Sequence, residues 1–564
     1  MRAFADLYRE LDSATATRHK IEALKAYLAP IVGEPARWDE AAWAVYLLSG
    51  GKPKQMIPTR ILRRLATQAT GLPEWLVEES YQNVGDLAET LSLLLPPARS
   101  SEDVPLEIWM SERLPALRKL DDDGRYARLA AYADALEDAD RLVFFKLTTG
   151  SLRVGVAKGQ VVQALAEATG LDRATIAQRL MGYTQAGRAV GGPDFAALVA
   201  SADTETAPDD LRPYPFFLAH QLNFTLDELP EKLGPPQDWI AEWKFDGIRG
   251  QLIRRGGDWR LWSRGEELIS EAFPDMAAIA AALPDGCTLD GEIVVAQAGV
   301  EVEGVEAFAK LQQRLNRKVL TDRHLAELPV AFIAYDLLAE HGEDVRARPQ
   351  HERRERLTRL VRAAQLHAPA LRLSPRVEAS DWPGLMAQRL RARDIGAEGL
   401  MLKGRDAPYG AGRRRSGPRS GDLWFKWKVD PMAVDAVLIY AQKGHGRRSG
   451  VYSDYTFAVW SGPVEQNSRT LVPFAKAYSG LTDEEMREVD AVIRRTTVES
   501  FGPVRSVKPT LVFELGFEGL APSKRHKSGV ATRFPRMLRW RRDKPVEEAD
   551  TLGDLQALLA GGGA

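Results

Sequence analysis

Cysteines and long apolar runs are nearly absent from this chain of 564 residues. The single cysteine, Cys287, excludes disulfides within the chain and any zinc site built on cysteine ligands. No apolar run reaches the roughly 20 residues of a membrane-spanning helix, and the first residues do not form a signal peptide. We therefore expect a cytoplasmic protein that does not cross a membrane.

A strong net charge is missing as well. Lys and Arg together number 76, and Asp and Glu number 78, which gives a formal net charge of -2. This balance does not by itself indicate a nucleic-acid-binding protein, but the sum hides local basic clusters. The composition is that of an ordinary globular protein, and the length predicts three or four domains with separate cores.

Residues 1–200 are predicted to be almost wholly helical. Two stretches rich in Ala, Leu and Arg, 125–145 and 158–180, repeat apolar residues at a spacing of three and four. In the second stretch Gly170 should end one helix, and Asp172 is placed to cap the next. A helix-turn-helix that reads bases is an alternative interpretation, although helical hairpins are common in any all-α domain.

Short strands are predicted after a linker at 201–215, which is rich in Asp, Thr, Ala and Pro. The segments 251–254 and 259–263 flank the turn sequence RGGD and should form a hairpin. The pattern of residues 330–338 indicates a buried strand. Pro431 should end a preceding strand, after which strand patterns return. These patterns lie at 434–441, 451–460 and 510–515.

Lysine chemistry is indicated by the segment 242–249, EWKFDGIR, in which Lys244 follows a strand-like run and precedes a glycine turn. A nucleophilic lysine has to be neutral, and at a pKa of about 10.4 only roughly one in a few thousand is neutral at pH 7. Partial burial and a cationic neighbour such as Arg249 favour the neutral form. Glu242 and Asp246 oppose it and therefore need other roles, such as holding a ligand or metal. A surface lysine paired with an aspartate is the alternative.

Three later segments carry charges in patterns that suit a phosphate ligand. In LDGEIVV, which starts at Leu289, an acidic pair precedes a β-branched run, although Asp-Gly-Glu is also a good turn sequence. In EGLMLK, Glu398 can hold a divalent cation while Lys403, at the other end of a short strand, reaches phosphate. In FKWK, period-two alternation places Lys426 and Lys428 on one face, where an anion between them would offset their repulsion.

Taken in order, these segments resemble the motifs of the covalent nucleotidyltransferases, which comprise the DNA ligases, RNA ligases and mRNA capping enzymes. The resemblance implies that Lys244 takes AMP or GMP as a phosphoramidate, with Glu242 reading the base and Arg249 near the sugar. Arg264, at a family-like distance after the lysine, would contact the 5′-phosphate of a nick. NAD-dependent bacterial ligases have a similar core but carry a four-cysteine zinc module, which this sequence cannot form.

The same resemblance assigns roles to the later motifs. Glu292 would lie near the ribose and a metal, and Tyr335 would stack on adenine, although an aromatic residue in a buried strand is otherwise simply core. Glu292 and Glu398 would together hold Mg²⁺ or Mn²⁺. The residues implied to bind ATP are Glu242, Arg249, Arg264, Glu292, Tyr335, Lys403, Lys426, Lys428, Arg533 and Arg536.

Two further segments resemble parts of DNA ligases outside the catalytic core. The segment 148–157, TTGSLRVGVA, is similar to a Gly-x-Leu-Arg-x-Gly segment of the helical DNA-binding domain in larger ATP-dependent ligases. Its glycines would let backbone amides approach DNA phosphates, and Arg153 would supply charge. A tight turn between helices is the alternative. The basic run 413–415, with Arg419, could contact DNA or form a surface loop.

The end of the chain carries a dense basic cluster between Lys524 and Lys544, in which Asp543 is the single acid. Such a cluster usually indicates a surface that faces phosphate. Within it, 533–536 and 541–544 resemble the last ligase motif, which orients the pyrophosphate of ATP. Asp430 lies where the family hinges its C-terminal OB-type barrel.

The sequence is thus identified as a member of the bacterial, three-domain type of ATP-dependent DNA ligase. The expected fold is multidomain α+β, with a helical DNA-binding domain (1–210), an α+β nucleotidyltransferase domain (211–429) and an OB-fold β-barrel (430–564). The expected enzyme is a monomer of the bacterial cytoplasm, associated with the nucleoid, that seals nicked double-stranded DNA in repair, recombination or replication. The alternatives are an RNA ligase, a GTP-dependent capping enzyme and an inactive DNA-binding scaffold.

Overall fold

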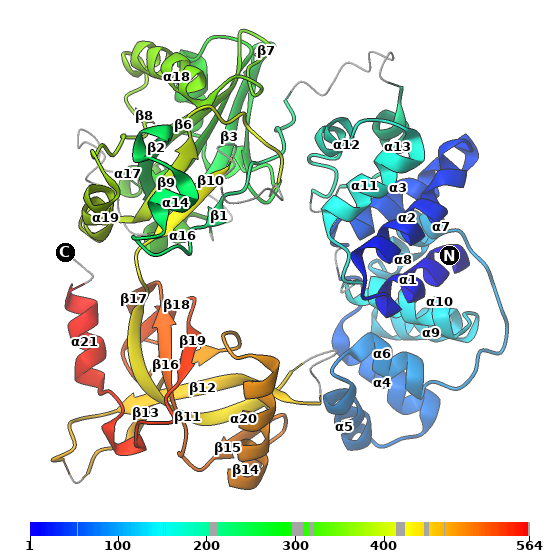
Figure 1. Ribbon diagram of the computed structural model, residues 1–564. Helices are drawn as coiled ribbons and strands as arrows, with labels where there is room; N and C mark the ends of the chain where they lie inside the picture. Colours follow the sequence, from blue (N-terminus) through cyan, green and yellow to red (C-terminus); the bar gives the residue numbers. More distant parts are fainter. Residues whose placement is uncertain are drawn as a thin grey trace. The chain divides into compact units, whose positions relative to one another are not determined.

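Two compact units make up the protein in a computed structural model (Figure 1). The structure describes all residues except 54, 151, 153, 186–187, 202–210, 296–307, 316, 318–319, 413–422, 445–449, 467 and 562–564. The first unit comprises Met1–Met56, Glu102–Leu120 and Lys146–Val429, and the second comprises Ile57–Ser101, Asp121–Phe145 and Asp430–Ala564. No helix within the described ranges is long and apolar enough to span a membrane.

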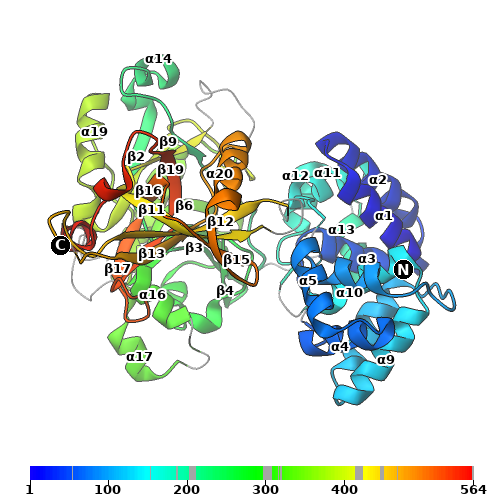
Figure 2. The ribbon, with the colours of Figure 1, turned by 90° about the horizontal axis from the view of Figure 1, so that it is seen from below.

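The helices of the N-terminal part of the first unit pack around α3 (Trp38–Leu48), which is buried at every residue from Ala41 to Leu48. Figure 2 shows α1, α2 and α11 side by side, and contacts join α1 to α2 and α2 to α11. The predicted helix end and helix start are confirmed, because Gly170 ends α11 with a left-handed φ of 73° and the Asp172 carboxylate caps α12. The other helices here are α1 (Arg2–Ser13), α2 (Thr17–Val32), α7 (Leu106–Ile108), α8 (Leu114–Leu117), α11 (Lys158–Thr169), α12 (Arg173–Arg179) and α13 (Gly192–Val199).

The predicted helical stretch 125–145 is divided into two helices, α9 (Asp122–Asp134) and α10 (Asp138–Thr149). The break is held by Arg141, a buried side chain that donates to the carbonyl oxygens of Leu136 at 3.3 Å and Pro96 at 2.8 Å. Pro96 is distant in sequence, so helical periodicity alone could not reveal this break. The remaining helices of this region are α4 (Thr59–Thr70), α5 (Glu74–Val84) and α6 (Leu87–Leu94).

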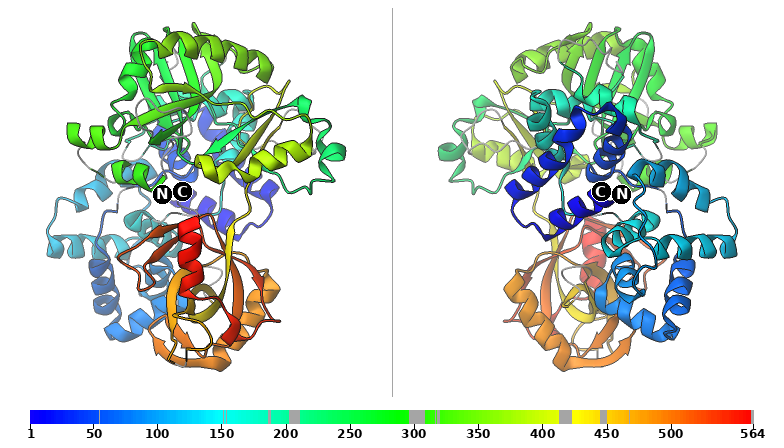
Figure 3. Two further views of the ribbon diagram at one scale, coloured as in Figure 1. Left: turned by 90° about the vertical axis from the view of Figure 1, so that its left-hand side faces the viewer. Right: turned by 90° about the vertical axis from the view of Figure 1, so that its right-hand side faces the viewer.

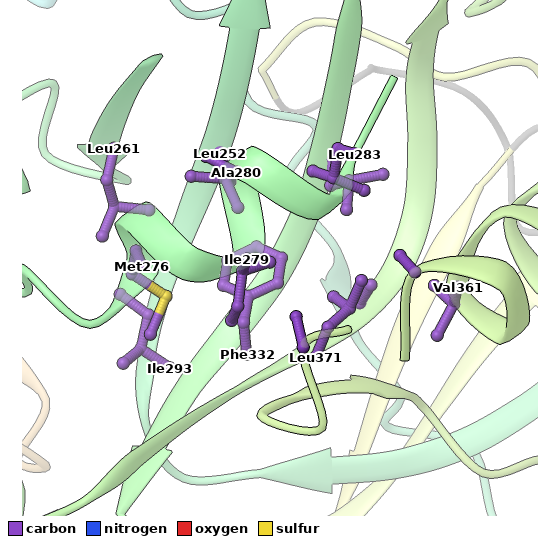
Figure 4. Close-up of a cluster of buried hydrophobic side chains, with 14 of the residues drawn as sticks. Leu252, Leu261, Met276, Ile279, Ala280, Leu283, Ile293, Phe332, Val361 and Leu371 are labelled. Carbon is purple, nitrogen blue, oxygen red and sulfur yellow. The ribbon is translucent and has the colours of Figure 1, made fainter. Parts of the chain in front are cut away.

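A six-stranded sheet forms one half of the central region, in the order β4-β3-β5-β6-β7, with β8 parallel to β6. Its strands are β3 (Ile248–Arg255), β4 (Asp258–Ser263), β5 (Cys287–Val295), β6 (Val330–Glu340), β7 (Glu343–Asp344) and β8 (Leu371–Leu373). Helices α15 (Met276–Ala282) and α18 (Gln350–Gln365) contribute to its main core, where Figure 4 shows Leu252, Ile279 and Phe332 close together. Helices α16 (Phe308–Leu315) and α17 (Asp322–Glu327) precede β6.

The predicted hairpin joins β3 to β4, with Arg255 opposite Asp258. Gly256 and Gly257 both have positive φ, at 62° and 82°, which suits a two-residue turn whose twist matches the flanking strands. The hairpin prediction is therefore confirmed.

A four-stranded sheet forms the other half, in the order β1-β10-β9-β2. Its strands are β1 (His220–Gln221), β2 (Trp239–Phe245), β9 (Ala397–Gly404) and β10 (Trp424–Lys428). One face is apolar: Leu400, Phe425 and Trp427 pack in a core that includes residues of α14 (Leu229–Leu233) and α19 (Trp382–Leu390). The half-buried Lys426 and Lys428 alternate with these aromatics, which confirms the predicted period of two.

The C-terminal part of the second unit is rich in strands, as predicted. Its main sheet runs β13-β12-β11-β15-β14, and β16 pairs with both β11 and β19. Figure 3 shows α21 against the strands of this part, and contacts join it to β11 and β17. The elements are β11 (Met432–Lys443), β12 (Tyr452–Trp460), β13 (Leu471–Ala477), α20 (Asp483–Thr496), β14 (Thr497–Phe501), β15 (Val504–Val507), β16 (Val512–Phe517), β17 (Gly519–Pro522), β18 (Val530–Arg533), β19 (Arg536–Trp540) and α21 (Leu552–Gly561).

Candidate active site

The polar face of the four-stranded sheet brings Lys244, Glu398 and Lys428 together. Lys244 Nζ donates to Glu398 Oε2 at 2.5 Å, and Lys428 Nζ lies 3.1 Å from the same oxygen. Burial by itself would raise the pKa of Glu398, but the positive charges of the two lysines bring it below its ordinary value. All three side chains remain partly exposed, so a ligand can reach them.

The turn after Lys244 is pressed against β5. The backbone N–H of Gly247 donates to Glu292 Oε1 at 3.2 Å, and a Cβ at Gly247 would lie only 2.2 Å from the carbonyl oxygen of Ile293. Glycine is therefore required at this turn. Burial raises the pKa of Glu292 to about 7, with Glu398 adding to this effect and Lys244 opposing it. The two carboxylates and the lysine thus act on one another electrostatically.

Asp290 and Tyr409 belong to the site but were not predicted from the sequence. Arg249 Nε and Nη2 donate to the Asp290 carboxylate at 3.1 and 2.8 Å, and Tyr409 Oη donates to the same carboxylate at 2.6 Å. Arg249 also donates to the carbonyl oxygen of Phe217 at 2.7 Å. Asp290 is fully buried, so this arginine is held rigidly in a site otherwise lined by aromatic rings, including Tyr335.

The signal for Asp290 was present in the sequence, as the first acid of the Asp-Gly-Glu segment. That segment lies inside β5 and is not a turn. Gly291 sits between the acids because a Cβ there would approach the Phe332 ring to 2.5 Å. Tyr409 follows β9 in a stretch without a repeating pattern, so nothing local identified it.

Glu242 and Lys403 are buried together on the same sheet. Their charged groups lie 2.7 Å apart, and Arg354 Nη1 donates to Glu242 at 2.7 Å. Lys403 Nζ also donates to the Tyr335 carbonyl oxygen at 2.9 Å. The predicted contact of Lys403 with phosphate and the predicted reading of the base by Glu242 stay predictions. Arg264, by contrast, has an exposed side chain after β4.

The donor set fits a small divalent cation. Mg²⁺ is usually bound through one or two carboxylates together with substrate phosphates and water. Glu292 and Glu398 are two such carboxylates close to Lys244, and within the described part of the chain no group of three or more His, Cys, Asp or Glu residues forms a complete metal site. A cation here would therefore depend on the nucleotide for further ligands.

The C-terminal basic cluster is less free than its sequence indicated. Arg536 lies 3.5 Å from Glu518, and Arg541 and Lys544 both pair with Asp435 Oδ2, at 2.6 and 2.8 Å. These acids lie on other segments, so a count along the cluster missed them. Other cluster residues pair with Glu488 and Glu514. The Arg533 guanidinium stacks on the exposed ring of Phe534, 5.1 Å from its centre.

Three other predictions concern Arg153, the basic run 413–415 with Arg419, and the proposed hinge at Asp430. Arg153 and the basic run 413–415 with Arg419 lie outside the described residues. Gly150 and Gly155, on either side of Arg153, have φ of 68° and 63°, a left-handed backbone that favours glycine. Asp430 is the first residue of the second unit after Val429, and its predicted role as a hinge stays a prediction.

Asp290→Asn should destabilise the protein strongly, because it leaves the Arg249 guanidinium buried without its counter-charge. We expect a loss of about 3 kcal/mol in the free energy of unfolding, measured by denaturant titration. Glu327→Gln removes the charge of an exposed carboxylate that pairs with Arg323, and should change little. If Asp290→Asn were as mild as this control, the buried pair would not be an anchor of the site.

Comparisons with known proteins identify the family of this chain. Three family models match: DNA ligase N terminus (residues 1–166), ATP dependent DNA ligase domain (217–428) and ATP dependent DNA ligase C terminal region (448–544). The solved structure Pmar-Lig_Pre shares the fold, with a TM-score of 0.60 at 14% identity over 96% of this chain and 99% of that chain.

Individual relatives are also similar to this chain in sequence. A probable DNA ligase of Koribacter versatilis is 34% identical over 519 residues, which cover 87% of this chain and 84% of the relative. A DNA ligase of Aeropyrum pernix is 30% identical over 571 residues, covering 91% and 90%. A longer probable DNA ligase of Opitutus terrae is 34% identical, with 74% of this chain matching 45% of the relative. The chain belongs to the ATP-dependent DNA ligases.

Proposed function

We propose that this ligase works through an AMP adduct on Lys244. The observation that carries the proposal is the shared carboxylate: Glu398 Oε2 lies 2.5 Å from Lys244 Nζ and 3.1 Å from Lys428 Nζ. A group of two ammonium ions around one carboxylate suits a ligand that brings further negative charge, such as the α-phosphate of ATP.

In the first step the Lys244 ammonium group loses a proton to solvent, and the neutral amine attacks the α-phosphorus. The phosphorus–nitrogen bond forms as the bond to pyrophosphate breaks. Lys426 and Lys428 then offset the charge on the phosphate. Mg²⁺ or Mn²⁺ held by Glu292 and Glu398 supplies further positive charge when bound.

The remaining steps transfer AMP and seal the strand. AMP passes from Lys244 to the 5′-phosphate at a nick, with Arg264 contacting that phosphate. The 3′-hydroxyl then attacks this phosphate and displaces AMP, which closes the backbone. Glu242 faces adenine, Tyr335 stacks on it and Arg249 lies near the sugar. Lys403 reaches a phosphate of ATP, and Arg533 and Arg536 orient its pyrophosphate.

The domains are proposed to divide the work. A helical domain (1–210), with Arg153, holds the DNA backbone, a nucleotidyltransferase domain (211–429) carries the chemistry, and an OB-fold domain (430–564) turns about Asp430. The ranges matched by the three family models support this order of domains, and the unit boundary after Val429 supports the division between the last two. We propose a monomer that acts on nicked duplex DNA at the bacterial nucleoid.

Lys244→Ala should be unable to seal an ordinary nick with ATP but should still seal a nick that already carries AMP on its 5′-phosphate. The reason is that the lysine takes up AMP in the first step and releases it in the second, and has no bond to make in the third. The measurement is gel-resolved sealing with Mg²⁺ and ATP, NAD or GTP. Lys232→Ala, at a surface ion pair with Glu231, is the control and should behave as the unaltered protein.

Sealing of an ordinary nick by Lys244→Ala would end the proposal, and use of NAD would end the assignment of residues 533–536 to ATP. Loss of sealing on both substrates would indicate that the variant is misfolded or cannot bind AMP. An unaltered protein that binds nicked DNA but seals neither substrate would favour an inactive scaffold, and a preference for RNA nicks would favour an RNA ligase.

Arg536→Ala should slow formation of the AMP adduct by about tenfold or more while leaving sealing of pre-adenylylated nicks nearly unchanged. The proposed role is confined to the pyrophosphate of ATP, which is absent from the later steps. Arg539→Ala, on the same strand and paired with Glu514, is the matched control. Equal losses in both assays would point to a general structural role for Arg536.

A further inference from the structure

The first turn of α18 binds to both sheets of the central region. Arg353 donates to the Asp336 carboxylate of β6 at 2.9 and 3.0 Å, and the next residue, Arg354, donates to Glu242 of β2 at 2.7 Å. All four side chains are buried. Adjacent arginines of one helix therefore tie together the strand that carries Tyr335 and the strand that carries Lys244.

The Glu242 carboxylate is held from two directions. Its Oε1 accepts from Arg354, and its Oε2 lies 2.7 Å from Lys403 Nζ. Arg354 is itself fixed, because its other terminal nitrogen donates to the carbonyl oxygen of Ser374. Lys403 Nζ lies 4.5 Å from the centre of the Tyr335 ring. Each carboxylate oxygen thus keeps one defined direction for a further donor.

The immediate neighbours keep the Glu242 carboxylate surrounded by positive charge. Burial lowers the pKa of Lys403, while Glu242 and Asp336 act in the opposite direction. The Arg354 guanidinium brings a second positive charge to the Glu242 carboxylate. An ionised carboxylate accepts hydrogen bonds and cannot donate them, so its orientation determines which groups it binds and which it repels.

We propose that Arg354 is a positioning residue that holds Glu242 as an oriented acceptor and thereby sets the preference for ATP over GTP. This inference rests on the proposed function, in which Glu242 faces the base. Adenine presents an amino donor at position 6, where guanine presents a carbonyl acceptor. A fixed carboxylate binds the first and repels the second, whereas a carboxylate that turns away discriminates less.

The test compares Arg354→Gln and Arg354→Lys with the unaltered protein. The control is Arg356→Gln, which removes an arginine of the same helix that pairs with Glu340. For each protein the KM of ATP in adduct formation, the inhibition constant of GTP against ATP and the midpoint of thermal unfolding are measured. Arg354→Gln should lower the ratio of the GTP constant to the ATP KM by about tenfold or more. The ratio for Arg354→Lys should lie between those of Arg354→Gln and the unaltered protein, because lysine keeps the charge but cannot bond to Glu242 and to the Ser374 carbonyl oxygen in the same way.

If Arg354 had only a structural role, its loss would weaken the binding of ATP and GTP by the same factor. An unchanged ratio of the GTP inhibition constant to the ATP KM in both Arg354 variants would therefore overturn the inference. A similar fall in Arg356→Gln would overturn it as well. If Arg354→Gln does not fold, the ratio in Arg354→Lys decides. Failure of the unaltered protein to form any adduct with ATP would instead contradict the proposed function.

Discussion

A single carboxylate, Glu398, sets the geometry around the proposed nucleophile. Its Oε2 oxygen contacts the ammonium groups of Lys244 and Lys428, which come from two different strands. The carboxylate thereby holds both ammonium groups on the same face of a sheet. The arrangement depends on the apolar opposite face, where Phe425 and Trp427 are buried. Successive side chains of a strand point to opposite faces of the sheet, so burial of Phe425 and Trp427 on one face places Lys426 and Lys428 on the other, where the site lies.

Buried ion pairs hold the rest of the site in place. Taking such charges out of water is costly, and the cost is offset only where the hydrogen bonds are complete. Asp290 meets this condition with two bonds from Arg249 and one from Tyr409. Glu242 meets it through Arg354 and Lys403. Both carboxylates are therefore held in fixed positions before any ligand binds, so little has to be reorganised when one does.

The sequence predicted features that depend on neighbouring residues. The Gly170 and Asp172 caps follow from local backbone geometry, and the strands follow from alternation. Partners distant in the chain were missed. Asp290 lies 41 residues from Arg249, and Asp435 lies 106 residues from Arg541, which it pairs with. No pattern along the chain shows which acid neutralises which base, so the basic C-terminal cluster looked freer than it is.

The most direct test of this account is to find where AMP becomes attached. The protein is first treated with pyrophosphate to remove any AMP already bound, then incubated with ATP and Mg²⁺, digested and mapped by peptide mass spectrometry. The account predicts one AMP per chain, on the peptide that contains Lys244. AMP on another residue, or efficient nick sealing without any AMP adduct on the protein, would contradict it.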